Sequence, residues 1–599
     1  SYSSWFLSNS ADEVVLLDTN LTEIDRVEYD GGPAFPDPNG ASMALRSPEL
    51  DNNDGANWCA GSEPYGSGDL GTPGQANACE AAPVVLTPIS TIQGAGSSSP
   101  LEGETVTIEA VVIGDFQGVP GSSELHPAQL SGFYVQEQSQ DVDGSAATSE
   151  GLFVYCGSSC AAMPVAVGDV VTVTGVVQEF FDLTQLNASA GSVEVTGSVA
   201  LPSPALINLP VASLDDYEAF EGMLVTFADT LTVSEYFQLG RYGEVVLYQG
   251  GRPYQFTHVN APDAAGNAAF EAELEKRRIT LDDDANGDNQ ALFEDLNVFF
   301  PRPGLSTTNF FRGGDTITGL TGVLDYSFSK YRLRPVLTEF DYTFQADNPR
   351  PMTPEDVGGS LKVVSANVLN YFSTVDNGSS ICSPSESMDC RGADSLQELE
   401  RQTAKLTAAL CEIDGDIVGL GEIENDASGT GSLDAFVGAL SSAGCGTYAY
   451  VDVGPIGDDA IKVALLYKSS TVTPVAQQTF VVDNSVDAAY EDGKNRPTLV
   501  QVFEEKASGE RVIVAAHHLK SKGSDCEDIG DANQNDGQGN CAATRATAAG
   551  IIADFIASDV IPDAGTDRVL VIGDLNAYKR EDAVMEYTGR GYVDLIEAV

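Results

Sequence analysis

The chain has 599 residues, of which 42% are hydrophobic and 20% are charged. This length predicts several domains rather than one, and the hydrophobic content excludes a largely disordered protein. With 30 basic and 89 acidic side chains, the formal net charge is −59, which excludes a protein that coats nucleic acid with a cationic surface. No stretch approaches the roughly 20 consecutive apolar residues that a membrane-spanning helix requires, so we predict no membrane span in this chain.

The ten cysteines fall into five pairs of sequence neighbours. Disulfides persist in oxidising compartments, so this pattern predicts five short-range disulfides in a protein that is secreted, extracellular or at the cell surface. The alternatives are ten reduced thiols or a metal site at Cys382 and Cys390, but the sequence contains no Cys-x-x-Cys motif. The predicted pairs are Cys59 with Cys79, Cys156 with Cys160, Cys382 with Cys390, Cys411 with Cys445, and Cys526 with Cys541.

The excess of acidic side chains is typical of proteins from saline environments. Salt at about 1 M shortens the Debye length to near 3 Å, which screens the self-repulsion of such a chain. We therefore expect a saline habitat.

Three β-rich segments are predicted in the first 345 residues. Residues 1–80 contain short apolar runs broken by turn residues, which indicates a small β-sandwich. Residues 85–204 hold about five strands with alternating apolar residues, which predicts a β-barrel. Residues 205–345 form a further β-rich segment of uncertain fold. Between Arg46 and Arg241 there is no Lys or Arg, so the barrel has no side-chain cation for a phosphate and we expect a spacer or docking module.

Residues 360–599 alternate apolar strands with helical segments. The leucines at 396, 399, 406 and 410 fall at helical spacing, and a second helix is predicted over 542–558. Two sheets packed between helices accommodate this order. The predicted fold class is therefore multidomain, with all-β modules followed by an α/β two-sheet sandwich.

Two adjacent histidines end one of the predicted strands of this sandwich. His517 and His518 follow the apolar run 511–516, and Lys520 and Lys522 come directly after them. Successive strand residues face opposite sides, so one histidine can face a cleft while the other faces away. An imidazole beside ammonium groups can give a proton to a leaving oxygen and neutralise a phosphate. A single motif of this kind is more simply explained as a polar loop.

Polar residues also follow three other predicted strands. They are Asn367, Glu422, and Asp574 with Asn576. Each alone is more simply explained as a cap or turn residue. Their repetition on separate strands of one domain favours a common site instead. Carboxylate and amide oxygens without a cysteine partner suit a hard cation, so the sequence predicts Mg²⁺ or Mn²⁺.

These segments together resemble one superfamily. Residues 365–372, 419–425, 494–497, 518–523 and 573–578 are similar to motifs of the exonuclease-endonuclease-phosphatase superfamily, most closely its secreted bacterial nucleases related to deoxyribonuclease I. The resemblance spans about residues 361–599. Residues 1–80 resemble the later strands of a lamin-tail domain, and residues 85–204 resemble the OB-like barrel of the same nucleases. The resemblance implies a bacterial nuclease with a two-sheet sandwich of the deoxyribonuclease I type.

The resemblance also implies a role for each candidate residue. Glu422 and Asp574 would bind the metal, with Asn367 positioning metal or phosphate. Asn576 and Asp574 would hold the phosphate and the attacking water, and His518 would protonate the leaving 3′ oxygen. The phosphate-binding cations would be Arg496, Lys520 and Lys522. The implied substrate is DNA, with RNA as a further candidate, and the products would carry 5′ phosphates.

One feature of the family is missing from the sequence. The family ends with an Asp-His pair whose histidine helps to activate water, and no histidine follows His518 in this chain. The first strands of the lamin-tail domain are missing too. We therefore expect a fragment, incomplete at both ends, that lacks a residue needed for full activity.

Acidic loops provide candidate Ca²⁺ sites. The run 282–287 matches the first half of an EF-hand loop, but Phe293 stands where the closing glutamate belongs. For each loop alone, a solvated turn is the simpler interpretation. The candidate ligands are Asp141, Asp143, Asp282, Asp284, Asn286, Asp531 and Asn533.

The predicted function is an extracellular, metal-dependent nuclease that hydrolyses phosphodiester bonds. One alternative keeps the fold but changes the substrate, as in a phosphatase or a phospholipid diesterase. A phospholipid diesterase is expected to have an exposed aromatic hairpin, and the sequence does not single one out. The other alternative is a non-catalytic surface or matrix protein. The oligomeric state is not predicted.

Overall fold

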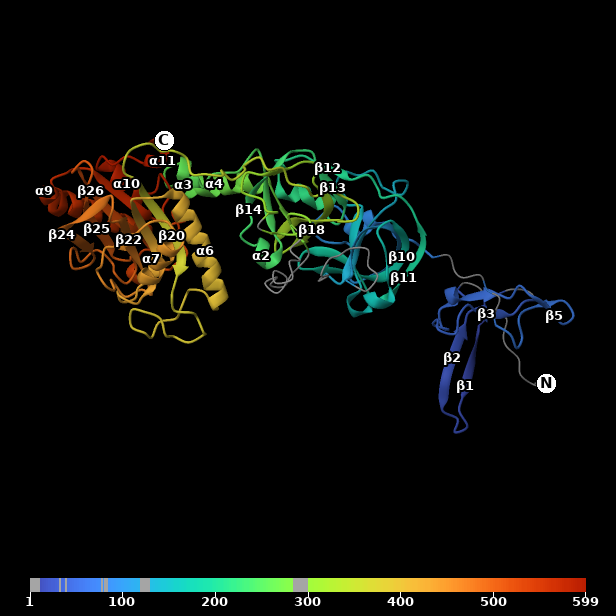
Figure 1. Cartoon of the computed structure of the whole chain (residues 1–599). Helices are drawn as coiled ribbons and strands as arrows, with labels where there is room; N and C mark the ends of the chain where they lie inside the picture. Colours follow the sequence, from blue (N-terminus) through green and yellow to red (C-terminus); the bar gives the residue numbers. More distant parts are fainter. Residues whose placement is uncertain are drawn as a thin grey trace.

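The computed structural model describes residues 11–598, apart from residues 32–33, 38–39, 77–78, 80–83, 119–129, 284–299 and 307. The chain is multidomain and β-rich, and its modules follow one another in chain order (Figure 1). Among the helices of the described residues, none combines the length and the apolarity that crossing a bilayer requires.

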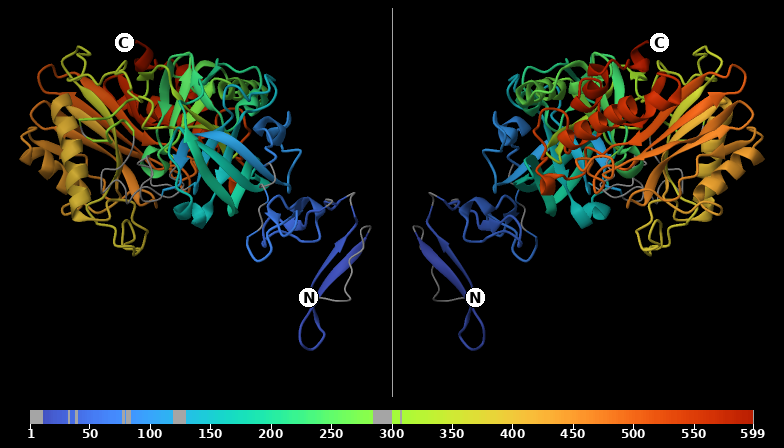
Figure 2. Two further views of the ribbon diagram at one scale, coloured as in Figure 1. Left: turned by 90° about the vertical axis from the view of Figure 1, so that its right-hand side faces the viewer. Right: turned by 90° about the vertical axis from the view of Figure 1, so that its left-hand side faces the viewer.

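The described part of residues 11–79 forms small sheets. They are three antiparallel pairs, β1 with β2, β3 with β4, and β5 with β6. The predicted β-sandwich is therefore not confirmed here. This module lies beside the rest of the molecule in both views of Figure 2. The strands are β1 (Asp12–Leu17), β2 (Glu23–Tyr29), β3 (Met43–Leu45), β4 (Trp58–Ala60), β5 (Pro64–Tyr65) and β6 (Asp69–Leu70).

A closed five-stranded barrel follows, as the alternating strands predicted. Its strand order is β7-β8-β9-β11-β10, and β10 pairs back onto β7. Inward-facing residues such as Ile108, Val154 and Val173 are fully buried, because side chains of one parity along a strand point into the barrel. Its elements are α1 (Ile89–Gln93), β7 (Thr105–Phe116), β8 (Gly132–Gln136), β9 (Gly151–Tyr155), the 3₁₀ segment 157–162, β10 (Asp169–Phe180) and β11 (Leu183–Ser198).

The β-rich segment of uncertain fold is an eight-stranded mixed sheet. Its order is β12-β13-β18-β19-β16-β15-β14-β17. It shares a hydrophobic core with the barrel, in which Phe116 and Tyr134 pack with Leu224 and Val323. Its elements are β12 (Ala205–Ile207), β13 (Leu224–Phe227), β14 (Leu231–Glu235), α2 (Leu239–Tyr242), β15 (Val245–Gln249), α3 (Phe256–Val259), α4 (Ala264–Glu275), β16 (Arg278–Leu281), β17 (Thr316–Ile317), β18 (Thr321–Ser327) and β19 (Lys330–Arg334).

The C-terminal domain contains two four-stranded sheets, in agreement with the predicted sandwich. Their orders are β20-β21-β23-β22 and β24-β25-β26-β27. A core that includes Ile417, Leu465, Val514 and Ala516 lies between them. The strands are β20 (Val363–Tyr371), β21 (Ile417–Glu424), β22 (Tyr448–Tyr450), β23 (Ile461–Lys468), β24 (Val472–Val482), β25 (Thr498–Glu505), β26 (Arg511–His518) and β27 (Val569–Asp574).

Helices cover the outer faces of the two sheets. Phe436 and Leu440 of α7, with Leu410 of α6, pack on the first sheet. Ala548 and Ile552 of α8 pack on the second. The helices are α6 (Leu396–Ile413), α7 (Ser432–Ser442), α8 (Ala542–Phe555), a π turn over 556–560, α9 (Ile561–Ala564), α10 (Asp582–Gly589) and α11 (Leu595–Ala598).

All five predicted disulfides are present. The pairing of sequence neighbours is confirmed, and Cys411 lies in α6. The bond between Cys526 and Cys541 closes the long loop between β26 and α8.

The candidate Ca²⁺ ligand Asp282 has a different role. It is 3% exposed, and its two carboxylate oxygens accept hydrogen bonds from Arg332 and Arg334. Ion pairs with two buried guanidinium groups occupy this carboxylate, so the prediction of a calcium ligand is wrong at Asp282. Asp284 and Asn286 lie outside the described residues.

The other acidic loops also have local explanations. Asp531 accepts hydrogen bonds from the backbone N–H and the hydroxyl of Thr544, so it caps the first turn of α8. Asn533 and Asp143 accept backbone N–H groups two residues further on, as turn residues do. Asp141 is exposed. The contacts of Asp531, Asn533 and Asp143 therefore support turns and a helix cap and do not require Ca²⁺.

Candidate active site

Each sheet of the C-terminal domain contributes one pair of parallel strands to a common edge. Asn367 of β20 pairs with Gly421 of β21, and His518 of β26 pairs with Asp574 of β27. Parallel neighbours end at the same edge of a sheet, so the polar residues at these ends are brought together. We call this set the strand-end cluster; it comprises Asn367, Glu422, His518, Asp574 and Asn576.

The histidine lies between the two carboxylates of the strand-end cluster. Nε2 of His518 is 4.0 Å from Oε1 of Glu422 and 4.0 Å from Oδ2 of Asp574. Glu422 and Asp574 belong to different sheets, so this contact joins the two halves of the sandwich. The predicted convergence of these three side chains is confirmed.

The backbone is irregular where the site is formed. The register of β20 with β21 shifts between Asn367 and Tyr371, and that of β21 with β23 shifts between Leu420 and Ile423. Glu422 has φ +63° and Asn576 has φ +50°. Bulges and left-handed residues re-aim side chains and are enriched at functional sites. These departures therefore turn the Glu422 and Asn576 side chains out of the ordinary strand directions.

Gly419 sets the close approach of the two sheets. A Cβ at this position would lie 2.5 Å from Cδ1 of Ile572, which belongs to the opposite sheet. A side chain there would have to displace the end of the Ile572 side chain. Gly419 thus permits the close packing of β21 against β27.

Asn367 and Asn576 support the carboxylates. Nδ2 of Asn367 donates to Oε1 of Glu422 at 2.9 Å, and the N–H of Asn370 donates to Oε2 at 3.1 Å. The N–H of Asn576 donates to Oδ1 of Asp574 at 2.8 Å, and Nδ2 of Asn576 donates to the carbonyl of Leu519 at 2.9 Å. Asn367 was predicted to position metal or phosphate; here it orients Glu422, and its Oδ1 accepts the N–H of Leu369.

The strand-end cluster has the donor chemistry that a small hard cation prefers. Glu422 and Asp574 supply carboxylate oxygens that retain lone pairs after the hydrogen bonds described above. Mg²⁺ is commonly held by one or two carboxylates and completes its shell with water and substrate phosphate. No group of three or more His, Cys, Asp or Glu side chains in the described residues is placed to hold a metal ion. The donor types of Glu422 and Asp574 suit Mg²⁺, and these two residues would be its protein ligands.

The two adjacent histidines face opposite sides, as predicted. His517 is fully buried, and its ring packs edge-on at 6.0 Å from the ring of Tyr587 on α10. Burial, followed by the positive charge of Arg496, lowers the pKa of His518 to about 4. His518 is thus neutral at neutral pH without substrate. In this state it is a hydrogen-bonding group and not the cation that the predicted role requires.

Cations lie near the strand-end cluster. Nε of Arg496 donates to Oδ2 of Asp459 at 2.9 Å, and NH2 of Arg391 lies 2.8 Å from Oδ1 of the same carboxylate. NH1 of Arg496 is buried and has no hydrogen-bond partner among the described residues. Burial and the charge of Arg496 lower the pKa of Lys520, so the two cations lie within electrostatic reach of each other. Both remain candidates for binding an anion.

Lys522 does not belong to this group, contrary to the prediction. Its ammonium pairs with the carboxylate of Glu581 and lies 4.2 Å from the centroid of the Tyr578 ring. Glu581 is 1% exposed. A buried carboxylate attracts the ammonium more strongly than the open site does, so Lys522 anchors its loop.

Asp459, which links Arg391 and Arg496, is marked by no local sequence motif. Asn425 fixes the loop that carries Asp459. Its Nδ2 donates to the carbonyls of Ile456 and Asp459 at 2.8 and 2.9 Å, and its Oδ1 accepts the N–H of Ile456. Asn425 belongs to the run 419–425 at the end of a predicted strand. Its position in that run was the one sequence feature that could have indicated its role near the site.

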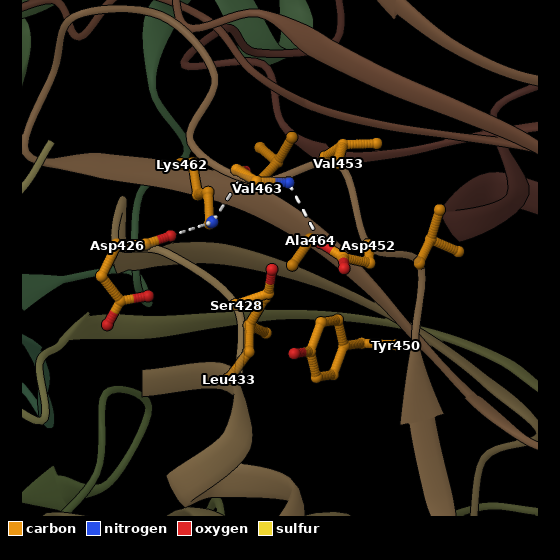
Figure 3. Close-up of a pocket in the computed structure, with 11 residues that line it drawn as sticks. Asp426, Ser428, Leu433, Tyr450, Asp452, Val453, Lys462, Val463 and Ala464 are labelled. Atoms are coloured by element: carbon orange, nitrogen blue, oxygen red, sulfur yellow. Dashed lines mark hydrogen bonds between the residues drawn. The ribbon is translucent and has the colours of Figure 1, made fainter. Parts of the chain in front are cut away.

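A small pocket lies beyond the carboxyl end of β21 (Figure 3). It encloses about 270 Å³, including open solvent at its mouth, and Asp426, Tyr450 and Lys462 line it. Nζ of Lys462 donates to the carbonyls of Asp426 and Gly454 at 2.9 and 3.0 Å. Burial lowers the pKa of Lys462 and raises the pKa of Asp426. Because no residue of the strand-end cluster lines this pocket, we interpret Lys462 as a structural link between two loops.

Gly573 offers a test of how tightly β26 and β27 hold the site. It has φ +125°, and a Cβ there would overlap the carbonyl oxygen of His517. We expect Gly573→Ala to lower the free energy of unfolding by about 3 kcal/mol, through backbone strain and overpacking. Calorimetry of the full-length protein measures this change. Gly438→Ala on α7 is the control, since nothing lies within 4 Å of its Cβ position and alanine favours helices. Equal effects of the two substitutions on the free energy of unfolding would contradict the close packing of β26 and β27 at Gly573.

Comparisons with known proteins match different parts of the chain. Residues 207–342 match the model of a domain of unknown function, DUF8508. No curated protein matches. Solved structures similar to the chain include endonuclease/exonuclease/phosphatase family proteins.

Three of these structures illustrate the extent of the similarity. The human Nocturnin catalytic domain with bound sulfate is 15% identical with a TM-score of 0.23, over 33% of this chain and 64% of that one. A family protein from Bacteroides thetaiotaomicron is 15% identical with a TM-score of 0.26, over 39% and 69%. A mannosyl-6-phosphatase of the same species is 16% identical with a TM-score of 0.25, over 39% and 71%. With scores this low, any proposed activity depends on the geometry of the site.

Proposed function

We propose that this protein is a metal-dependent phosphodiesterase of the exonuclease-endonuclease-phosphatase superfamily, and that it hydrolyses DNA. The observation that carries the proposal is the position of His518 Nε2, 4.0 Å from a carboxylate of each sheet. Arg496, with a free NH1, lies close enough to lower the pKa of this histidine. Carboxylates that can bind a metal, an imidazole, and a guanidinium with one unpaired nitrogen are together groups that can promote cleavage of a P–O bond.

The metal would be Mg²⁺ or Mn²⁺, held by Glu422 and Asp574. Bound there, it would supply Lewis-acid stabilisation of the charge that develops on the phosphate oxygens. Asn367 keeps Glu422 in place through its 2.9 Å hydrogen bond, and the N–H of Asn576 does the same for Asp574.

Other side chains of the site would bind the phosphate and transfer a proton. Arg496 and Lys520 would bind the phosphate and orient it. Nε2 of His518 faces the carboxylates and would give the proton that passes to the leaving 3′ oxygen. Since this imidazole is neutral without substrate, the role requires the negative charge of a bound phosphate to raise its pKa. Activation of the attacking water is assigned to no residue of this chain.

The test uses the full-length protein with supercoiled plasmid and Mg²⁺. We expect nicked and linear DNA, no cleavage when EDTA is present, and a loss on the order of 10²-fold in His518→Ala, because general acid catalysis contributes at least that much. Bis(4-nitrophenyl) phosphate should be hydrolysed faster than the monoester 4-nitrophenyl phosphate. Intact plasmid with rapid monoester hydrolysis would indicate a phosphatase. No hydrolysis of any of these substrates would indicate a non-catalytic surface or matrix protein.

A phospholipid diesterase is the second candidate, and one observation favours it. The hairpin between β10 and β11 ends in Phe180 and Phe181, which are 56% and 80% exposed. An exposed aromatic hairpin was the feature expected of such an enzyme, and amphipathic or aromatic tips insert at membrane interfaces. The barrel lacks cations, which disfavours anionic lipids. Phosphatidylcholine vesicles added to the plasmid assay distinguish the two candidates. Hydrolysis of the lipid with intact plasmid would indicate a phospholipid diesterase.

The proposed setting is outside the cell. The five disulfides favour an oxidising compartment, and the net charge of −59 favours saline surroundings. We propose a secreted bacterial protein with a lamin-tail module and an OB-like barrel in front of the catalytic domain.

A further inference from the structure

Two helices of the eight-stranded sheet domain lie against the C-terminal domain. In Figure 1, α3 and α4 lie at the junction of the two domains. The N–H of Arg580 donates to the carbonyl of Thr257 at 2.9 Å, and the N–H of Asp263 donates to the carbonyl of Asp536 at 3.2 Å. Nδ2 of Asn267 donates to the carbonyl of Asn535 at 3.2 Å. The junction is thus made by backbone groups as well as side chains, which fixes its geometry.

A buried carboxylate links this junction to the loop after His518. Glu581 is 1% exposed, and its Oε1 accepts a hydrogen bond from the hydroxyl of Thr257 at 2.6 Å. The same oxygen pairs with the ammonium of Lys522. Lys522 follows His518 by four residues. One oxygen atom therefore joins the sheet domain to the loop that leaves the strand-end cluster.

The same loop is held from its other side by α8. Arg545 is 1% exposed, and its guanidinium donates to the carbonyls of Lys520, Asn540 and Gln538 at 3.1, 2.6 and 2.7 Å. Arg545 of the C-terminal domain holds the loop after His518 through the carbonyl of Lys520. Thr257 of the sheet domain supports the same loop through Glu581. A loop held on both sides keeps Lys520 and His518 in one arrangement, and such preorganisation is what binding and catalysis need.

We propose that the domain spanning 207–342 positions the candidate active site, and that Thr257 is its positioning residue. This role rests on the proposed function. Within the part of the chain that the structure describes, Thr257 forms no hydrogen bond with the strand-end cluster or with Arg496, so it acts through Glu581 and Lys522. Removing its hydroxyl leaves the buried Glu581 with one donor fewer and weakens the restraint on the loop that carries Lys522 and Lys520.

The first test is kinetic and uses the full-length protein with bis(4-nitrophenyl) phosphate. Thr257→Val keeps the shape of the side chain and removes the hydroxyl. Supporting groups of this kind contribute about 10-fold or more to activity, so we expect kcat to fall by about 10-fold with KM changed less than about twofold. Thr257→Ser should restore kcat. Asn267→Ala is the matched control, because it removes another hydrogen bond of the same junction without touching Glu581. Equal losses in both variants would overturn the proposal.

The second test does not depend on activity. Hydrogen–deuterium exchange of residues 519–525 should rise in Thr257→Val and in Glu581→Gln, and should stay at the wild-type level in Asn267→Ala. Unchanged exchange in Thr257→Val, or an equal rise in Asn267→Ala, would overturn the positioning role. If the wild-type protein hydrolyses nothing while exchange behaves as expected, the proposed function fails and the structural link stands.

Discussion

Glu422→Gln should reduce hydrolysis of bis(4-nitrophenyl) phosphate by the full-length protein on the order of 10³-fold, since such a site depends on preorganised charge. The substitution keeps the size of the side chain and removes its charge. Oε1 of Glu422 lies 4.0 Å from His518 and accepts the amide of Asn367, so a neutral amide there both weakens metal binding and disturbs the pairing with Asn367. Steady-state kinetics at several Mg²⁺ concentrations measures the loss.

The control for this variant is Glu412→Gln on α6, whose side chain is exposed. We expect its activity to lie within about twofold of wild type, as for most surface substitutions. Calorimetry should give similar unfolding temperatures for both variants. A Glu422→Gln protein that keeps more than a tenth of the wild-type rate would exclude Glu422 from the reaction.

The strand ends of the C-terminal domain were predictable because the pattern is local. Apolar runs end at Asn367, Glu422, His518 and Asp574, and the structure brings those four side chains to one edge. Pairs of cysteines close in sequence were predictable for the same reason. The closure of the barrel and the order of the eight-stranded sheet depend on pairings across long separations, such as β16 with β19, which periodicity does not encode.

The functions of individual charged residues were less predictable. Lys522 is adjacent to the histidines in sequence, yet it pairs with Glu581, 59 residues away. Asp459 connects Arg391 and Arg496 across separations that no local motif marks. Whether a charged side chain faces the site or the core depends on which opposite charge is buried nearby. The sequence shows the charges but not which of them share a buried environment.

Asp282 is the buried charged residue whose substitution we expect to lower the free energy of unfolding most. Its carboxylate accepts hydrogen bonds from Arg332 and Arg334, and Arg334 also pairs with Asp325, which accepts the hydroxyl of Tyr134 from the barrel. Asp282→Ala would leave two buried guanidinium groups with one carboxylate fewer. Breaking a buried ion pair on one side costs about 3–5 kcal/mol, so we expect calorimetry to show a loss of that size for the sheet domain.

The same experiment separates an ion-pair role from a calcium site. If Asp282 acts through the two arginines, EGTA should leave the unfolding temperature of the wild-type protein unchanged while Asp282→Ala lowers it. Asp141→Asn, at an exposed acidic loop, should change the stability by less than about 0.5 kcal/mol, as surface substitutions usually do. An EGTA effect as large as that of Asp282→Ala would restore the calcium interpretation. Because Tyr134 connects the network to the barrel, a loss at Asp282 should also weaken the contact between the two domains.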